Sequence, residues 1–302
     1  MTPRYIGDLA IGQCLYVPII DENAGMINDP VLLKLEDNKY WLSIADSDVL
    51  LWAKGLAIGF NLDVKIKEPE VYPLAIQGPK SEDLMVKVFG NKIKSIKYFN
   101  FEMFEFLGVN QLIARSGYSK QGGFEIYFRG FEHGCQIWDT LWEAGKEFKL
   151  VPMGFAALDM LRTEAGLILG GNEFSDETDP FEAGIGFTVP LKTKEANFIG
   201  KEALVKRKEN PHRKLVGLEI EGNEKVNLGD CVHIHRGQVG TITTGIISPI
   251  LNKNIALCRI DIHSSEIGTK VEVGKLDGHQ KRISAKIVKF PFYDPDKSRV
   301  RS

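Results

Sequence analysis

Short apolar runs bounded by turn residues recur along the first half of the chain. Runs rich in Val, Ile, Leu, Tyr and Phe, each flanked by Gly, Asn or Asp, predict strands at residues 14–20, 31–35, 40–44, 111–115 and 124–128. The last two enclose a glycine-rich turn. This spacing predicts a sheet in the first part of the protein.

Other segments carry apolar residues at three- and four-residue spacing, which is typical of amphipathic helices. These predicted helices lie at residues 49–60, 81–89, 137–148 and 154–169. The acidic residues within 46–48 favour the start of the first helix, which we expect to cover the sheet, and Gly170 favours the end of the last helix. Alternating strands and helices predict an α+β or α/β layered body.

From residue 214 onward the helical periodicity disappears, and strand-like segments follow one another. They lie at residues 214–220, 231–242, 255–262, 269–273 and 283–290. We therefore expect a separate all-β domain. The charged stretch 201–214, which contains Pro211, is the predicted hinge in front of it.

Length and charge narrow the class of protein. The chain has 302 residues, with 38 Lys and Arg, 40 Asp and Glu, and a formal net charge of −2. This length predicts two domains, and the lack of a long apolar run predicts a soluble protein. A charge near zero removes the broad basic field that nucleic-acid or membrane binding would need, so we expect neither partner. Four widely separated cysteines and no export signal predict reduced thiols in a cytoplasmic protein.

Motifs of several common enzyme classes are missing from the sequence. It has no G-x-S-x-G, no P-loop and no G-x-G-x-x-G after a strand, so elbow hydrolases, P-loop phosphoryl transfer and common dinucleotide binding lose support. His233 and His235 would share one face of a strand and offer two metal ligands, but no third ligand is evident. We therefore predict no metal site.

Three segments set polar groups among glycines, at residues 25–30, 115–126 and 158–166. Taken alone, they fit a turn before a strand, a hairpin and an exposed helix face. They also fit a ligand site. The residues by themselves leave both interpretations open.

At these segments the sequence resembles the glycine-cleavage T-protein superfamily of tetrahydrofolate-dependent one-carbon transferases. Gly25–Asp29 is similar to the family's G-G-x-x-D-D segment, and Arg115–Glu125 is similar to its R-T-G-Y-T-G-E-D-G-[FY]-E motif. Further blocks resemble family segments in the same order, at residues 161–166, 179–184, 198–203, 244–249 and 255–257. The resemblance covers nearly the whole chain.

This resemblance implies a fold and a cofactor. It implies an α+β protein, with a T-protein-like folate-binding body of two α/β subdomains at residues 1–205 and a C-terminal β-barrel at residues 213–295. The family's opening segment has no counterpart upstream of Cys14, so we expect the body to be incomplete at its N-terminus. The implied cofactor is tetrahydrofolate.

Within the superfamily, some segments resemble one group more than another. Residues 43–48, 52–57 and 116–125 are most similar to the dimethylsulfoniopropionate demethylases. Residues 154–162 and 170–173 resemble generic T-proteins and related methyltransferases more closely. The chain is therefore expected to belong to the demethylases or to a neighbouring group.

Asn28 stands where aminomethyltransferases of the family keep the first aspartate of the D-D pair, and only Asp29 is acidic. Aminomethyl transfer must move protons, whereas methyl transfer from a sulfonium needs only that N5 be held in line. The resemblance therefore implies a demethylase that moves a methyl group from a small dimethyl-sulfonium donor to N5 of tetrahydrofolate, with Asn28 and Asp29 at the catalytic centre. An aromatic face, from Trp41 or Tyr5, would attract the donor's charge.

The resemblance also implies cofactor-binding residues. Glu125 would accept the 2-amino group and ring N–H of the pterin as a bidentate pair. Tyr118 and Tyr16 would pack on the flat ring system. Arg162 would pair with the carboxylate of the folate tail.

Alternatives remain open for one residue and for the activity. Arg162 would otherwise form a structural ion pair with Glu164 or Glu182. The chain would otherwise be an aminomethyltransferase of the glycine cleavage system, with a lipoyl carrier protein as partner. A third hypothesis is a folate-binding paralogue without transferase activity, although the K-G-C-Y-x-G-Q-E motif of such proteins is missing.

Overall fold

The computed structural model describes residues 1–45, 48–192, 196–279 and 281–300. The chain forms two compact units, and each is built from separate stretches of sequence. The first unit combines residues 1–5, 16–30 and 156–295, and the second combines residues 6–15, 31–155 and 296–302. The predicted domains 1–205 and 213–295 follow the sequence instead, and their boundaries stay predictions.

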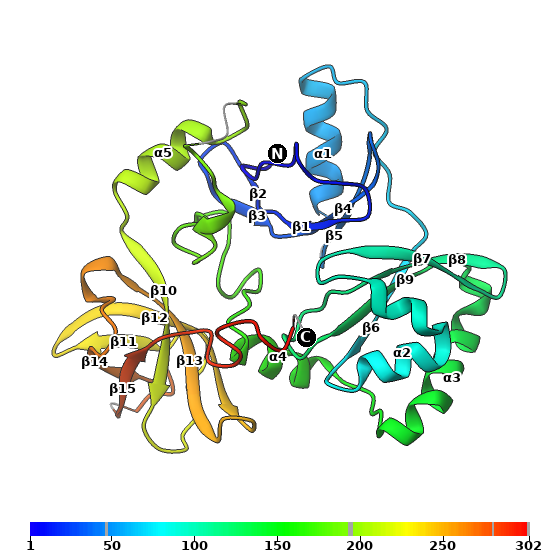
Figure 1. Ribbon diagram of the computed structural model, residues 1–302. Helices are drawn as coiled ribbons and strands as arrows, with labels where there is room; N and C mark the ends of the chain where they lie inside the picture. Colours follow the sequence, from blue (N-terminus) through cyan, green and yellow to red (C-terminus); the bar gives the residue numbers. More distant parts are fainter. Residues whose placement is uncertain (46–47, 193–195, 280, 301–302) are drawn as a thin grey trace. The chain divides into compact units, whose positions relative to one another are not determined.

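The second unit is organised around a four-stranded antiparallel sheet (Figure 1). Its strands, in spatial order, are β6 (Tyr72–Gln77), β9 (Gly123–Phe128), β8 (Val109–Ala114) and β7 (Phe101–Phe106). Helices α2 (Ser81–Phe89) and α3 (Gly134–Gly145) cover one face. Side chains alternate between the two faces of a strand, so Phe124 and Ile126 of β9 pack against Met85 of α2 and Leu141 of α3.

A smaller sheet covers the opposite face. It contains β1 (Cys14–Tyr16), β4 (Val31–Glu36) and β5 (Lys39–Ser43), in that order. Cys14 and Leu33 are buried against Leu112 and Tyr127. Because the side-chain period of a strand is two, Glu125 lies on the same face of β9 as Tyr127.

The first predicted helix is confirmed as α1 (Asp48–Gly59), but only part of its predicted apolar face is buried. Val49 and Ala53 are buried, whereas Leu51 and Ile58 are 70% and 82% exposed. Phe60, expected on the buried face, follows the helix and is 62% exposed. Its predicted acidic start includes residues 46–47, which lie outside the described residues.

A closed six-stranded barrel dominates the first unit, which confirms the predicted α+β protein with a C-terminal barrel. Its strands, in spatial order, are β10 (Arg213–Ile220), β13 (Lys253–Asp261), β12 (Gly237–Ser248), β11 (Cys231–Ile234), β14 (Lys270–Gly274) and β15 (Arg282–Val288). Pairing of β15 with β10 closes the barrel and leaves no open edge. Leu218, Val232 and Ile287 are fully buried in its core.

The remainder of this unit packs around a second core. It contains the hairpin of β2 (Ile19–Ile20) and β3 (Met26–Asn28), and the helices α4 (Phe155–Glu164) and α5 (Lys201–Glu209). Met26 of β3, Leu204 of α5 and Leu257 of β13 are buried together in this core. Burial of these side chains fixes the short hairpin that carries Asn28.

Two helix predictions need correction. The helix predicted for 154–169 ends at Glu164, because Gly166 takes a left-handed backbone (φ 62°) and the Leu167 N–H donates back to the Arg162 carbonyl at 2.8 Å. Gly170 is therefore not its stop. The stretch predicted as a hinge is helix α5 over most of its length, held by the fully buried Leu204.

Two strand predictions also need correction. The strand predicted for 14–20 is broken into β1 and β2, and the strand predicted for 231–242 is a hairpin of β11 and β12. His235 lies in the turn of that hairpin at φ 54°, so it does not share a strand face with His233. Among the described residues, no group of three His, Cys, Asp or Glu is placed to hold a metal ion.

The cysteines and the helices bear on the expected environment of the chain. Cys14 and Cys258 are buried, Cys231 is half-buried and Cys135 is exposed, and all four are free thiols. Over the part of the chain that the structure describes, no helix combines the length and the apolar character needed to cross a membrane.

Packing requires a glycine at position 25. A Cβ atom there would lie 1.7 Å from the carbonyl oxygen of Asp176, so the backbone would have to move. We expect Gly25→Ala to lower the free energy of unfolding by about 1–3 kcal/mol, the usual cost of overpacking. Gly55→Ala in α1 is the control, because an added Cβ there meets nothing within 4 Å and should stabilise the helix by about 0.5–1 kcal/mol. Equal losses of unfolding free energy in the two variants, measured by urea unfolding, would contradict this account.

Candidate functional site

Glu125 lies in the middle of β9, between Ala114 of β8 and Ala75 of β6. Its side chain is partly buried, and the Ser116 hydroxyl donates a hydrogen bond to Oε2 at 2.5 Å. No described residue donates to Oε1. The carboxylate therefore has one oxygen held by the protein and one open to a ligand's donors.

The surroundings of Glu125 are weakly polar. Burial raises the pKa of Glu125 above its ordinary value, and the hydrogen bond from Ser116 opposes this rise. Burial, with a smaller effect of the Glu125 charge, raises the pKa of the Cys14 thiol to about 12. The same two causes raise the pKa of Tyr127. Both neighbours are therefore neutral near pH 7, and Glu125 is the acidic group among them.

Tyr118 belongs to the loop that joins β8 to β9, two residues after Ser116. Tyr118 is half-buried, whereas Ser116 and Ser119 are buried. The Ser119 hydroxyl donates to Oε1 of Gln77, at the end of β6, at 2.6 Å. The structure thus places Tyr118 in a loop anchored on both sides of it, and brings Gln77 into the site, a residue that sequence reasoning missed.

The same loop departs from the family motif at consecutive positions. Lys120 stands where the motif has a glycine, and it is 9% exposed with a left-handed backbone (φ 53°). Gln121 and Gly122 stand where the motif has glutamate and aspartate. Nε2 of Gln121 is buried and has no acceptor among the described residues. This loop has therefore lost the two acids of the motif and gained an unpaired amide donor.

In the first unit the structure brings Tyr16, Asn28 and Asp29 together. The Tyr16 hydroxyl donates to Oδ2 of Asp29 at 2.8 Å, and the Asp29 backbone N–H donates to Oδ1 of Asn28 at 2.9 Å. Pairing of Ile19 with Asn28 in the β2–β3 hairpin fixes the position of this group. The Asn28 amide nitrogen has no acceptor among the described residues.

Asp29 is the residue of this group that can exchange a proton near neutral pH. Burial raises its pKa from 3.8 to about 7, although hydrogen bonds from Tyr16 and from its own backbone N–H act in the opposite direction. A carboxyl group with such a pKa is suited to general acid or base catalysis. Asn28 cannot take this role, because its side chain is a neutral amide.

Arg162 lies in a buried polar network and is 1% exposed. Its guanidinium donates to Oε2 of Glu173 at 2.5 Å, to Oδ1 of Asp159 at 2.8 Å and to Oγ1 of Thr244 at 2.8 Å. Glu173 is fully buried and also accepts hydrogen bonds from Thr243 and Thr244 of β12. The network therefore ties α4 to the barrel.

The structural partners predicted for Arg162 are wrong. Glu164 accepts a hydrogen bond from Ser248 at 2.5 Å, and Glu182 pairs with Arg259 at 3.6 Å. Arg162 pairs with Glu173, eleven residues further along, because the chain reverses after α4. Its predicted contact with the folate tail stays a prediction.

The aromatic faces expected to attract a cationic donor lie in different surroundings. The guanidinium carbon of Arg129 lies 4.8 Å from the ring centroid of Trp41. A protein cation therefore already occupies a face of that ring. Tyr5 is 49% exposed.

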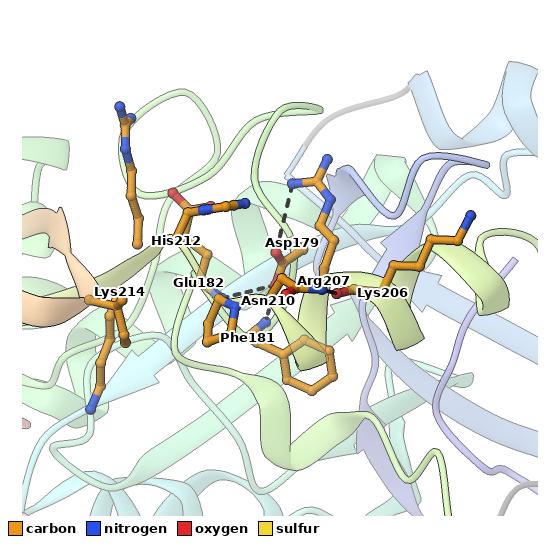
Figure 2. A pocket seen from close by; sticks show the side chains of 11 residues that line it. Asp179, Phe181, Glu182, Lys206, Arg207, Asn210, His212 and Lys214 are labelled. Carbon is orange, nitrogen blue, oxygen red and sulfur yellow. Dashed lines mark hydrogen bonds and ion pairs between the residues drawn. The ribbon is translucent and has the colours of Figure 1, made fainter.

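A cavity of about 650 Å³ opens beside α5 and the start of β10 (Figure 2). None of the predicted site residues lines it. Asp179 accepts hydrogen bonds from the backbone N–H groups of Phe181 and Glu182 and lies 3.7 Å from Arg207. Figure 2 shows the charged ends of Lys206 and Lys214 pointing in different directions. These two lysines therefore do not converge on one point of the cavity.

The raised pKa of Asp29 predicts a pH-dependent stability. Above about pH 4 the folded chain holds a proton on Asp29 that the unfolded chain has lost. The free energy of unfolding should therefore fall between about pH 4 and about pH 7, by at most about 1.4 kcal/mol per pH unit. In urea unfolding across this range, Asp29→Asn should lack this fall in the free energy of unfolding. Tyr16→Phe should extend the fall to higher pH, because it removes a hydrogen bond that lowers the pKa of Asp29. Superimposable profiles for Asp29→Asn and the original chain would contradict the assignment.

The Arg162 network predicts that a buried ion pair contributes far more to the free energy of unfolding than an exposed one. Arg162→Met leaves the Glu173 carboxylate buried without its cation, and we expect a loss of about 3–5 kcal/mol in the free energy of unfolding. The control is Lys253→Met, because Lys253 and Glu219 form a pair with side chains 51% and 42% exposed, and such pairs contribute about 0–1 kcal/mol. A loss for Arg162→Met as small as that of the control would rule out a structural role for the network.

Comparison with known proteins gives several relatives. A trimethylamine-oxide aldolase of Ruegeria pomeroyi is 45% identical over 309 residues, which cover 99% of this chain and 39% of the relative. A dimethylsulfoniopropionate demethylase of the same organism is 39% identical over 280 residues, which cover 92% of this chain and 76% of the relative. The chain thus spans about two fifths of the length of the aldolase and about three quarters of that of the demethylase.

Fold and family models agree with these relatives. The crystal structure of glycine cleavage system aminomethyltransferase T from Bartonella henselae superimposes with a TM-score of 0.87 and 25% identity, covering 96% of this chain and 79% of that one. Residues 1–193 match the GCVT N-terminal domain, and residues 213–294 match the glycine cleavage T-protein C-terminal barrel domain. The chain therefore belongs to the glycine cleavage T-protein family.

Proposed function

We propose that this chain is a tetrahydrofolate-dependent one-carbon transferase that moves a methyl group from a small methylated donor to N5 of tetrahydrofolate. The leading donor is a dimethyl-sulfonium compound such as dimethylsulfoniopropionate. The observation that carries this choice is Asn28, a neutral amide whose carbonyl accepts the Asp29 N–H at 2.9 Å. A sulfonium already carries a good leaving group, so the protein needs to orient the reactants more than to move protons.

The fit of Glu125 to a pterin supports the choice of tetrahydrofolate. A pterin presents its 2-amino group and a ring N–H side by side, and a carboxylate accepts such a pair bidentately. Oε1 of Glu125 accepts from no described residue, and Oε2 has a second lone pair beside the one used by Ser116. Bound tetrahydrofolate would supply the nucleophilic N5. Tyr118, in the same unit as Glu125, is proposed to contact its ring system, whereas the contacts of Tyr16 and Arg162 with it stay predictions.

Ser116 has a defined part in this proposal. Its hydroxyl donates to the Glu125 carboxylate and opposes the rise in pKa that burial causes. This bond favours the ionised carboxylate, which is the form that accepts two donors. Ser116 therefore prepares Glu125 for a pterin before the ligand arrives.

A second candidate is aminomethyl transfer with a lipoyl carrier protein as partner. The observation that favours it is Asp29, whose pKa of about 7 lets it take or give a proton. The similarity to a trimethylamine-oxide aldolase adds methylated amines and amine oxides to the donors worth testing. These donors share a small methylated head group with the sulfonium.

The folate site makes a direct prediction for Glu125→Gln. An amide cannot accept both pterin donors as a carboxylate does, so the affinity for tetrahydrofolate should fall at least about tenfold, the lower end of the loss of a charged hydrogen bond. Isothermal titration measures this. Glu105→Gln is the matched control, because Glu105 is an exposed glutamate of β7 in the same unit. Unchanged affinity in Glu125→Gln would remove the proposed site.

Product analysis separates the two candidate reactions. With tetrahydrofolate and dimethylsulfoniopropionate, the purified chain should form 5-methyltetrahydrofolate without any lipoyl carrier. Asn28→Asp should not increase this product, because methyl transfer from a sulfonium needs no added acid. Formation of 5,10-methylenetetrahydrofolate from an aminomethylated lipoyl carrier, with no methyl product from any donor, would favour aminomethyl transfer instead.

A further inference from the structure

Gln77, the last residue of β6, makes an unusual number of contacts through one side chain. Its amide nitrogen donates to the carbonyls of Ser116 at 3.1 Å, Phe124 at 3.3 Å and Ile76 at 3.3 Å. Its amide oxygen accepts from the Ser119 hydroxyl at 2.6 Å. The side chain therefore contacts Ser116 and Ser119 of the loop that joins β8 to β9, and Phe124 near the start of β9.

Backbone contacts strengthen this attachment. The N–H of Gly78 donates to the carbonyl of Gly122 at 2.9 Å. Gly123 pairs with Gln77 in the β6–β9 register. A Cβ atom at Gly117 would lie 2.0 Å from the Gln77 amide oxygen, so the loop backbone packs directly on the amide. The loop is therefore held on Gln77 and Gly78 at Ser116, Ser119 and Gly122.

Two residues that contact Gln77 are directly connected to the proposed folate-binding residues. Ser116, whose carbonyl accepts from Gln77, donates through its hydroxyl to Glu125. Ser119, which donates to Gln77, directly follows Tyr118. One amide thus fixes the partner of the carboxylate and the neighbour of the aromatic ring.

We propose that Gln77 is a positioning residue of the folate site, which holds the β8–β9 loop so that Glu125 and Tyr118 meet the pterin in a fixed arrangement. This inference rests on the proposed function. A loop that is already ordered loses less conformational freedom when a ligand binds. Only an amide serves here, because it offers a donor to the Ser116 carbonyl and an acceptor to the Ser119 hydroxyl.

The test compares Gln77→Met with a matched variant of another buried glutamine. Gln111 of β8 is fully buried and makes a similar two-way contact, donating to the Arg129 carbonyl at 3.0 Å and accepting from the Arg129 N–H at 2.7 Å. It lies at the opposite end of the β8–β9 pair, away from the loop. Gln111→Met therefore carries the same change without disturbing the loop.

We expect both variants to lower the thermal midpoint and only Gln77→Met to lower the affinity for tetrahydrofolate, about tenfold by titration calorimetry at a temperature where both are folded. In turnover, Gln77→Met should raise KM for tetrahydrofolate and leave kcat within about twofold. Equal losses of affinity in the two variants, or none in either, would overturn the proposal.

A second pair of variants tests the route through Ser119. Ser119→Ala removes the donor to the Gln77 amide oxygen, whereas Ser119→Thr keeps a hydroxyl. We expect Ser119→Ala to weaken tetrahydrofolate binding and Ser119→Thr to restore most of it. The double variant Gln77→Met with Ser119→Ala should bind no more weakly than Gln77→Met alone, because the two residues act as a unit. Fully additive losses would contradict this coupling.

Amide hydrogen exchange separates failure of this inference from failure of the proposed function. In the chain without any ligand, Gln77→Met should speed exchange in residues 116–123 at least about tenfold, and Gln111→Met should not. Unchanged exchange in Gln77→Met would overturn the positioning role, whatever the chain binds. Faster exchange in Gln77→Met, together with no tetrahydrofolate binding by the original chain, would contradict the proposed function. The link between the loop and folate would then fail as well.

Discussion

The hydrogen bond from Ser116 to Glu125 is the interaction on which this account of the site depends. It joins a loop to the middle of a central strand, and it holds one oxygen of a partly buried carboxylate while the other accepts from no described residue. Two layers of packing make it possible: helices α2 and α3 cover one face of the sheet, and β4 and β5 cover the face to which Glu125 points. Without this packing the carboxylate would be solvated, and its affinity for paired N–H donors would fall.

The two clusters of predicted residues differ in chemical character. Around Glu125 the groups hold and orient, because the carboxylate is fixed and its neighbours Cys14 and Tyr127 stay neutral. Around Asp29 the groups can exchange protons, because the pKa of that carboxyl lies near 7. Asn28 beside it is neutral and already engaged by the Asp29 N–H. The first cluster is therefore suited to holding N–H donors, and the second to exchanging a proton.

Much of the fold could be predicted from sequence, because barrel strands and amphipathic helices repeat with simple periods. The prediction of 154–169 as one helix was wrong because apolar spacing continues past Gly166, whose left-handed backbone ends the helix. Helix α5 was missed because one buried side chain, Leu204, holds it and leaves no apolar stripe. Gln77 and the partnership of Arg162 with Glu173 could not be found, because each depends on contacts that only the folded chain creates.

Counting the protons that accompany tetrahydrofolate binding tests the central claim most directly. Burial raises the pKa of Glu125, and a pterin would bind its ionised form, so binding should drive a proton off this residue in mildly acidic solution. Titration calorimetry in two buffers of different ionisation enthalpy, from about pH 5 to about pH 7, gives the number of protons released when tetrahydrofolate binds. The account predicts more protons released by the original chain than by Glu125→Gln. Equal proton release, with equal affinity, would contradict it.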